Sequence, residues 1–213
     1  MQNNMTRNEW LKIHNHAARN YINSQWSREV LLGMGKQRKK LFAQASGDVL
    51  DVGCGYGVNF PYLIHAKSIT GVDFSPVMLN KAREIMRSAN ITADLREGDA
   101  EALQFADNSF DTVISTLSTC SFFNPIIALQ EMRRVCKPNG KILLAEHGRS
   151  TWEWLGKYQD RHVRQQVEEG GCRWNQEPQE LVKEAGLNIL HAERTLLGIF
   201  HVMVGSPAKP ARR

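Results

Sequence analysis

Three glycines at alternate positions follow a short apolar run in the stretch VLDVGCGYG, which spans residues 49–57. Glycine loses more backbone entropy on folding than any other residue, so it weakens the strand or helix in which it lies. Gly53, Gly55 and Gly57 therefore indicate a backbone path that side chains would block, as where a ligand approaches the main chain closely. Two acids accompany them: Asp51 precedes the glycines, and Asp73 ends the next apolar run, 22 residues after Asp51.

These residue types suit the binding of a nucleoside. Glycines after a parallel strand expose backbone amides to a ligand, and the carboxylate of Asp73 can accept hydrogen bonds from both hydroxyls of a ribose. Asp99 and Ala100 follow a third extended run and are placed to meet the edge of an adenine. Three successive strand ends thus offer contacts to the tail, the sugar and the base of one nucleoside ligand.

The spacing of the glycines narrows the choice of nucleoside. A dinucleotide site has the pattern GxGxxG and holds a pyrophosphate at a helix N-terminus. Here the third glycine comes one residue too early, and Asp51 would place a negative charge near that phosphate. An acid at this position suits a ligand whose tail carries an amino group and whose centre is a cation. S-adenosylmethionine is such a ligand.

The elements that must position these residues follow from the hydrophobic pattern. We expect strands at residues 48–52, 68–73, 92–96, 111–116 and 141–146. The helices between them are expected at residues 60–65, at residues 76–89 after Ser75-Pro76, and from Asn124-Pro125 to a turn at residues 137–140. Ser or Asn followed by Pro is a helix-start signal. Strands that alternate with helices predict an α/β fold with a parallel sheet.

The C-terminal part follows another pattern. Helices are expected at residues 151–167 and 177–185, followed by extended runs at residues 187–195 and 199–204. The short connection Leu196-Leu197-Gly198 predicts that these two runs form an antiparallel hairpin.

Four motifs give the chain a resemblance to a known family. They are VLDVGCGYG (49–57), ITGVDFSPVMLNKARE (69–84), EGDAEALQFADNSFDTVIS (97–115) and EMRRVCKPNGKILLAEH (131–147). The chain resembles class I S-adenosylmethionine-dependent methyltransferases of the type 11 kind, closely over about residues 47–147. The resemblance implies a Rossmann-like three-layer sandwich whose seven-stranded, mostly parallel sheet ends in an antiparallel hairpin.

The resemblance also implies roles for individual residues. Asp51, Gly53 and Gly55 would line the methionine part of the cofactor, with Cys54 as a small filler. Asp73 would hold the ribose. Phe74 and Met78 would flank the adenine, and Asp99 and Ala100 would meet its edge. Thr116 and Leu117 would lie beneath the sulfonium. Tyr56 departs from the family, which commonly has a small residue there, and its ring would cover the cofactor or narrow the acceptor pocket.

Three parts of the chain are expected: an N-terminal helical lid (1–46), a methyltransferase domain (47–205) with a helical cap insert at about 148–178, and a disordered tail (206–213). The acceptor pocket is expected to draw aromatic residues from the lid and from the cap. Besides Tyr56, the candidates are Tyr21, Trp26, Trp152 and Tyr158. Such aromatic residues can equally serve only to pack the cap against the body.

The methyl acceptor is less well defined than the donor. His147 follows the fifth strand and is the candidate general base for a hydroxyl acceptor, although it can also be a polar residue bonded to a loop. A thiol, with an ordinary pKa of about 8.5, needs little help to ionise. We expect a small, partly apolar acceptor, with a thiol or phenol favoured. Phosphatidylethanolamine N-methylation at a membrane surface is the alternative enzyme function, and a non-catalytic cofactor-binding scaffold is the alternative of another class.

The distribution of charge and the spacing of the cysteines limit which partners the chain can have. The net charge of the 213 residues is +5, and residues 1–45 contribute +6 from eight Lys/Arg and two Glu. This basic segment can contact anionic lipid, whereas no module with interleaved aromatic residues predicts nucleic-acid binding. Cys54, Cys120, Cys136 and Cys172 show no CxxC or CxxH spacing. We therefore expect no metal site, reduced thiols and a cytoplasmic protein.

Overall fold

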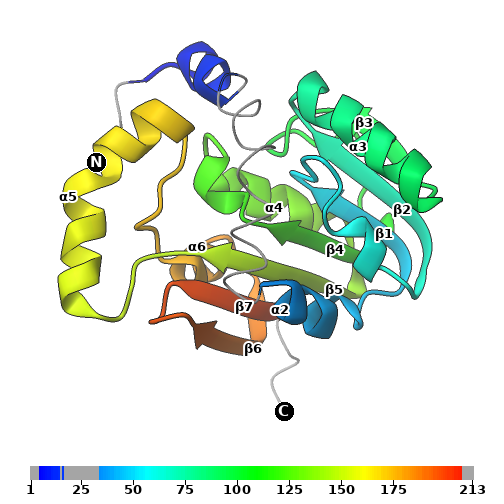
Figure 1. Cartoon of the computed structure of the whole chain (residues 1–213). Helices are drawn as coiled ribbons and strands as arrows, with labels where there is room; N and C mark the ends of the chain where they lie inside the picture. Colours follow the sequence, from blue (N-terminus) through cyan, green and yellow to red (C-terminus); the bar gives the residue numbers. More distant parts are fainter. Residues whose placement is uncertain (1–4, 15, 17–33, 208–213) are drawn as a thin grey trace.

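The computed structural model describes residues 5–14, 16 and 34–207. Residues 7–14 are helical, and the elements from α2 onward form three layers around one sheet (Figure 1). The sheet has seven strands in the order β3-β2-β1-β4-β5-β7-β6. The strands are β1 (Gly47–Val52), β2 (Ala66–Asp73), β3 (Asp94–Glu97), β4 (Phe110–Thr116), β5 (Cys136–His147), β6 (Asn188–Thr195) and β7 (Phe200–Ser206).

The first five strands run parallel to one another, and β7 runs antiparallel to both β5 and β6. The predicted α/β class, the mostly parallel seven-stranded sheet and its closing hairpin are confirmed. Strand order reverses between β1 and β4, because β1 pairs with β2 on one side and with β4 on the other. Ligands of such sheets bind at the carboxyl ends of the strands beside this reversal.

Helices cover both faces of the sheet. They are α2 (Met34–Phe42), α3 (Pro76–Ala89), α4 (Pro125–Val135), α5 (Glu153–Gly170) and α6 (Pro178–Glu184), with one-turn 3-10 helices η1 (Phe60–Tyr62) and η2 (Thr119–Ser121). Successive strand residues point to opposite faces. Leu50 accordingly packs with residues of α4 and α6, while its neighbour Val49 packs with residues of α2 and α3.

Several local predictions differ from the structure. The helix expected at residues 60–65 is only the turn η1, because the backbone leaves the helical conformation at Leu63 and β2 begins already at Ala66. The turn expected at residues 137–140 is an irregularity inside β5, where the register with β4 shifts between Phe110 and Thr112. Asn124 caps α4 as predicted, since its side chain accepts hydrogen bonds from Ile126 N and Ile127 N.

The sequence predicts a helical lid at the N-terminal end of the chain and a disordered tail at its C-terminal end. The structure describes two parts of the expected lid, the helix of residues 7–14 and α2, which packs against β5 and β7. Strand β7 extends to Ser206, and Arg133 Nε donates to the carbonyl oxygen of Pro207 at 3.0 Å, so the first two residues of the expected tail are bonded to the body. None of the helices in the described part of the chain is long and apolar enough to cross a membrane.

Candidate cofactor and acceptor site

The glycine turn after β1 has left-handed backbone conformations. Gly53 has a φ of +70°, and a Cβ there would lie 2.7 Å from the Ser118 hydroxyl oxygen. Gly55 has a φ of +55°, but a Cβ there would meet no atom within 4 Å. Gly53 is therefore required by packing as well as by backbone conformation, whereas Gly55 borders open space at the carboxyl end of the sheet. The approach of a ligand to these glycines stays a prediction.

Asp73 ties the end of β2 to this turn. Its carboxylate accepts hydrogen bonds from Gly55 N at 2.8 Å and from Ser75 N at 2.9 Å. The side chain is buried, and this burial raises the pKa of Asp73 to about 6. Ser75 occupies the N-cap position of α3 as predicted, but its side chain makes no capping hydrogen bond. The carboxylate beside it thus orders the backbone at this helix start.

Asp51 lies fully buried at the end of β1. One carboxylate oxygen, Oδ2, accepts a hydrogen bond from Asn59 Nδ2 at 2.9 Å, while Oδ1 has no partner among the described residues. Burial raises the pKa of Asp51 to about 7. A buried acceptor without a donor costs free energy, so this oxygen suits a ligand that brings a donor of its own.

A buried polar cluster that the sequence analysis missed supports Asp51. Arg38 of α2 donates to the side chains of Asn59 and Thr116, and its Nη1 lies 2.7 Å from Thr116 Oγ1. Asn59 Nδ2 bridges Thr116 and Asp51. Arg38 had been counted with the basic residues of the N-terminal segment. Arg38 lies four residues after Met34 and therefore on the apolar face of α2. This spacing could have predicted from the sequence that Arg38 is buried.

The N-terminal helix covers the ends of β3 and β4. Trp10 Nε1 donates to the carbonyl oxygen of Ser121 at 2.9 Å, and the ring of His14 meets that of Phe74 edge to face, with 5.8 Å between centroids. Arg7 forms an ion pair with Asp99 and bonds to Glu101 Oε2 at 3.0 Å. The residues predicted to contact an adenine, Phe74 and Asp99, are therefore both in contact with this helix.

The remaining predicted cofactor residues lie near the same strand ends. Met78 is half-buried on α3, and Ala100 packs against the core beneath α4. Leu117 follows β4 with a left-handed φ of +53° and donates its N–H to Ala145 O at 3.0 Å. Cys54 is buried, and burial together with the charges of Asp51 and Asp73 raises the pKa of its thiol well above the usual range. A protonated, buried thiol agrees with the predicted role as a small filler.

The predicted acceptor residues are scattered. Tyr21 and Trp26 lie outside the described residues. Tyr56 is half-buried in the glycine turn. Trp152 and Tyr158 are 51% and 50% exposed, at and just after the start of α5. Their rings contact other aromatic rings, those of Trp154 and Trp174 respectively. Their role in an acceptor pocket stays a prediction.

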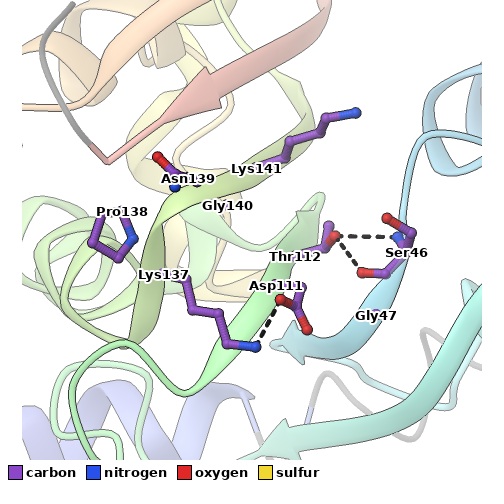
Figure 2. A pocket seen from close by; sticks show the side chains of 9 residues that line it. All are labelled: Ser46, Gly47, Asp111, Thr112, Lys137, Pro138, Asn139, Gly140 and Lys141. Carbon is purple, nitrogen blue, oxygen red and sulfur yellow. Dashed lines mark hydrogen bonds and ion pairs between the residues drawn. The ribbon is translucent and has the colours of Figure 1, made fainter.

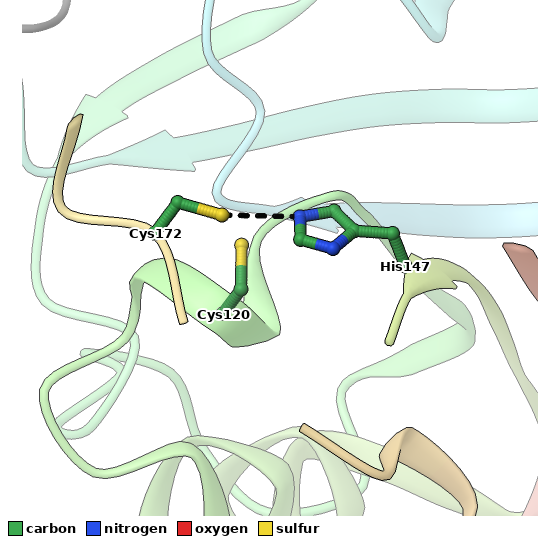
Figure 3. Close-up of side chains that lie close together, drawn as sticks. All are labelled: Cys120, His147 and Cys172. Atoms are coloured by element: carbon green, nitrogen blue, oxygen red, sulfur yellow. Dashed lines mark hydrogen bonds between the residues drawn. The ribbon is translucent and has the colours of Figure 1, made fainter. Parts of the chain in front are cut away.

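His147 ends β5 and faces two thiols. Its Nε2 lies 3.3 Å from Cys172 Sγ, and Cys120 Sγ lies beside them (Figure 3). Burial alone would lower the pKa of His147, but the charge of Cys120, that of Glu146 and a backbone hydrogen bond with Trp174 together raise it above its usual value. The neighbouring Cys172 thiol and His147 in turn hold the pKa of Cys120 well below its usual range.

Glu146, which the sequence analysis also missed, holds the turn that carries Cys120. Its fully buried carboxylate accepts hydrogen bonds from Ser118 N at 3.0 Å, Thr119 N at 3.2 Å and Thr119 Oγ1 at 2.9 Å. Burial raises the pKa of Glu146 to about 7. A strand residue thereby fixes η2 to the end of β5.

A hollow of about 680 Å³ lies elsewhere, at the starts of β1 and β4 (Figure 2). Two of its polar side chains are paired: Lys137 Nζ bonds to Asp111 Oδ1 at 2.7 Å, and Thr112 Oγ1 donates to Ser46 O at 2.9 Å. This is the edge opposite the glycine turn. It contains none of the predicted cofactor or acceptor residues.

A family model described as a methyltransferase domain matches residues 50–144, a segment that runs from β1 into β5 and includes the glycine turn, Asp73 and Asp99. This match places residues 50–144 in the type 11 methyltransferase family. The cofactor of this family is S-adenosylmethionine.

Curated relatives and a solved structure agree with this assignment. The mitochondrial methyltransferase OMS1 of Saccharomyces cerevisiae is 32% identical over 189 residues, which cover 80% of this chain and 40% of OMS1. A phosphatidylethanolamine N-methyltransferase of Cereibacter sphaeroides is 37% identical over 103 residues (47% of this chain, 51% of that protein). The human thiol S-methyltransferase TMT1B is 34% identical over 125 residues (54% and 51%). The crystal structure of protein PH0226 from Pyrococcus horikoshii superimposes with a TM-score of 0.65 at 25% identity, covering 88% of this chain and 94% of that one.

The chain spans about half the length of the curated relatives that it matches. Within that span, its residues fit the cofactor of the family. Gly55 opens onto free space, the Asp73 carboxylate stands at the adjoining strand end, and Asp51 Oδ1 is a buried acceptor that lacks a donor among the described residues.

Proposed function

We propose that the chain transfers a methyl group from S-adenosylmethionine to a small, partly apolar acceptor, with a thiol favoured over a phenol. The observation that supports S-adenosylmethionine as the donor is the arrangement of Gly55 and Asp73. Open space lies beside Gly55, and the buried Asp73 carboxylate is bonded to its N–H. A thiol as the methyl acceptor is supported by the relative named a thiol S-methyltransferase. A thiol acceptor also needs the least chemistry from the protein, because it ionises near neutral pH.

The cofactor supplies a methyl group that is already activated on a sulfonium, so the protein has to bind, align and exclude water. In this proposal Asp73 exchanges its hydrogen bond from Gly55 N for bonds from the ribose hydroxyls. Asp51 accepts from the amino group of the methionine part, and Arg38 keeps Asn59 and Thr116 in place behind it. Phe74 and Met78 flank the adenine, and Asp99 and Ala100 meet its edge.

In this scheme the helix of residues 7–14 acts as part of the lid. It contacts Phe74 and Asp99 directly, so the cofactor would have to enter beside it or displace Arg7 from Asp99. Closing such a lid would exclude water from the transfer step.

His147 stays the predicted base for a hydroxyl acceptor. Its Nε2 is directed at Cys172, so it would have to turn away from the thiols to take a proton from an acceptor. A thiol acceptor does not need this step, which is a further reason to favour it.

Phosphatidylethanolamine N-methylation is the second candidate. One relative carries that name, and large apolar side chains are exposed near the start of α5: Trp152, Trp154, Tyr158, Leu196 and Leu197. The two leucines belong to the β6–β7 turn, which bonds to residue 151 through Thr151 N and Leu197 O. Aromatic and aliphatic side chains gathered in this way favour contact with a membrane surface.

An acceptor panel tests the proposal. Purified protein with labelled donor is offered alkyl and aryl thiols, phenols, amines and phosphatidylethanolamine vesicles, and products are read by mass. Methylated thiol together with released S-adenosylhomocysteine is the expected result. Methylation of the lipid alone would favour the second candidate. Cofactor binding without S-adenosylhomocysteine from any acceptor would instead identify a non-catalytic scaffold.

A further inference from the structure

Three metal-ligating side chains meet beside the acceptor end of the sheet. Cys120 lies on η2 after β4, His147 is the last residue of β5, and Cys172 follows Gly171, which ends α5. Their ligand atoms all lie within 4.8 Å of one another, and no further His, Cys, Asp or Glu of the described residues joins the group. Figure 3 shows both sulfur atoms and one ring nitrogen directed toward a common centre.

The spacing fits a tetrahedral zinc ion. With Zn–S distances of about 2.3 Å and Zn–N distances of about 2.0–2.1 Å, a tetrahedral centre separates its sulfur and nitrogen ligands by roughly 3.5 Å. The distance between Cys172 Sγ and His147 Nε2 is 3.3 Å. Small side-chain adjustments therefore suffice to place a cation between them.

Neighbouring groups hold the segments of the two cysteines in position, as is usual for metal sites. Glu146 fixes the turn of Cys120 through the Thr119 and Ser118 amides. Arg173 N donates to the carbonyl oxygen of Cys120 at 3.1 Å and so joins the Cys172 segment to the same turn. The left-handed φ of Gly171, +68°, turns the chain back from α5 at this point.

We propose that Cys120, His147 and Cys172 together bind one Zn²⁺ ion. Catalytic zinc sites have three protein ligands and keep the fourth position for water or substrate, whereas structural sites use four. Three ligands at the carboxyl end of β5 therefore leave one position open on the acceptor side. There a thiol acceptor would bind as its thiolate, with its proton released to solvent; this second step rests on the proposed function, and the metal site does not. His147 would then be a ligand and not a base.

Metal titration of the full chain tests the site. Protein purified under a reductant and stripped by a chelator is dialysed against Zn²⁺ and assayed for bound metal, with one ion per chain expected. Cys120→Ser, Cys172→Ser and His147→Gln should each weaken binding by at least the roughly 10- to 100-fold that loss of an outer partner costs. Cys136→Ser, at another buried thiol, is the matched control and should bind as the wild type does.

Cobalt gives a reading that does not depend on the folding of variants, because the wild-type Co²⁺ form should show a thiolate charge-transfer band in the near ultraviolet. The site is overturned if that band is absent, if zinc binding survives in both cysteine variants, or if Cys120 and Cys172 form a disulfide and take up no zinc after reduction.

The acceptor step has its own readout. A small alkyl thiol should shift the cobalt band, and thiol methylation should fall at least tenfold in chelated protein and return with Zn²⁺. An unshifted band or full activity in chelated protein overturns the acceptor step and leaves the metal site standing. Failure of every acceptor in every metal form overturns the proposed function while the titration still reports on the site.

Discussion

At the ends of β1 and β2, the side chains that meet the glycine turn lie within one continuous segment in which only η1 separates the two strands, and Asp73 follows Asp51 by 22 residues. At the ends of β4 and β5, Cys120, His147 and Cys172 come from a one-turn helix, a strand end and the segment that follows the C-terminal end of α5. The cofactor half thus depends on local backbone geometry. The acceptor half depends on how separate segments pack.

This difference has consequences for mutation. In the proposed cofactor half, the backbone of the turn would contact the cofactor, so a side chain added to the turn should destroy the site. In the acceptor half, a single buried carboxylate, Glu146, joins η2 to β5, so removing it should disturb the acceptor side and spare the cofactor. Cofactor binding and acceptor turnover should therefore respond to different substitutions.

The largest effect is expected from Gly55→Val. A β-branched residue at a φ of +55° costs about 1–2 kcal/mol in backbone strain, and its side chain would fill the open space above the turn. Cofactor binding measured by calorimetry should fall below detection while the far-ultraviolet circular dichroism spectrum is retained. Gly170→Val is the control, because that site also has no atom within 4 Å but lacks a left-handed φ. Cofactor binding by Gly55→Val at wild-type affinity would remove the turn from the site.

Glu146→Ala should act on the other half. Three donors at Ser118 and Thr119 lose their acceptor, and unsatisfied buried donors cost about 1–3 kcal/mol each, so we expect the free energy of unfolding to fall by about 2–4 kcal/mol after partial hydration. Acceptor turnover should drop tenfold or more, while the cofactor Kd stays within about twofold. Glu146→Gln, which keeps one acceptor oxygen, should recover part of both losses. A cofactor Kd that rises in step with the loss of turnover would show that the two halves are not separate.

Asp73→Ala should weaken cofactor binding by about 1–3 kcal/mol, or roughly 5- to 150-fold, the typical loss of a hydrogen bond to a charged group. Asp94→Ala serves as the control for charge, since Asp94 is an exposed acid on the neighbouring β3 and pairs with Arg96. Unchanged affinity in Asp73→Ala would mean that the ribose is held elsewhere.

The same difference explains what the sequence could predict. Glycines at alternate positions, Ser75-Pro76 and Asn124-Pro125 act within a few residues, so the strand ends, the helix starts and the βαβ order could be read directly. Arg38 was missed because a charged residue was assumed to face solvent, although its neighbours Leu41 and Phe42 are core residues. Once buried, it needs Asn59 and Thr116 as acceptors, and these lie 21 and 78 residues away.

The cysteines show the limit more clearly. The zinc patterns that a sequence reveals have short spacings, but Cys172 and His147 are 25 residues apart and are brought together by the return of the chain after α5. Gly171 was the local signal for that return, since a left-handed residue there ends the helix. Its consequence for Cys120 depends on tertiary packing, which no local pattern contains.

The smallest effect is expected from a change of pH. Its size tests whether Asp51 and Asp73 bind the cofactor in their ionised form. Burial raises the pKa of Asp51 to about 7 and that of Asp73 to about 6, above the ordinary value of 3.8. Each acid is therefore protonated in the folded protein when the pH falls below those values, and a protonated carboxyl accepts hydrogen bonds from the ribose or the amino group poorly. Cofactor affinity should rise between pH 6 and pH 8, by about twofold if Asp73 must ionise and by about tenfold if Asp51 must ionise.

The stability of the cofactor-free protein should change in the opposite sense. Because the folded pKa values are raised, these two acids favour folding below about pH 4 and lose that contribution as the pH rises through 6 and 7. Asp51→Asn should remove the Asp51 part of both trends, and thermal unfolding with and without cofactor across this range measures both together. An affinity that is flat from pH 5 to pH 8 in the wild type would mean that neither buried carboxylate meets the cofactor in its ionised form.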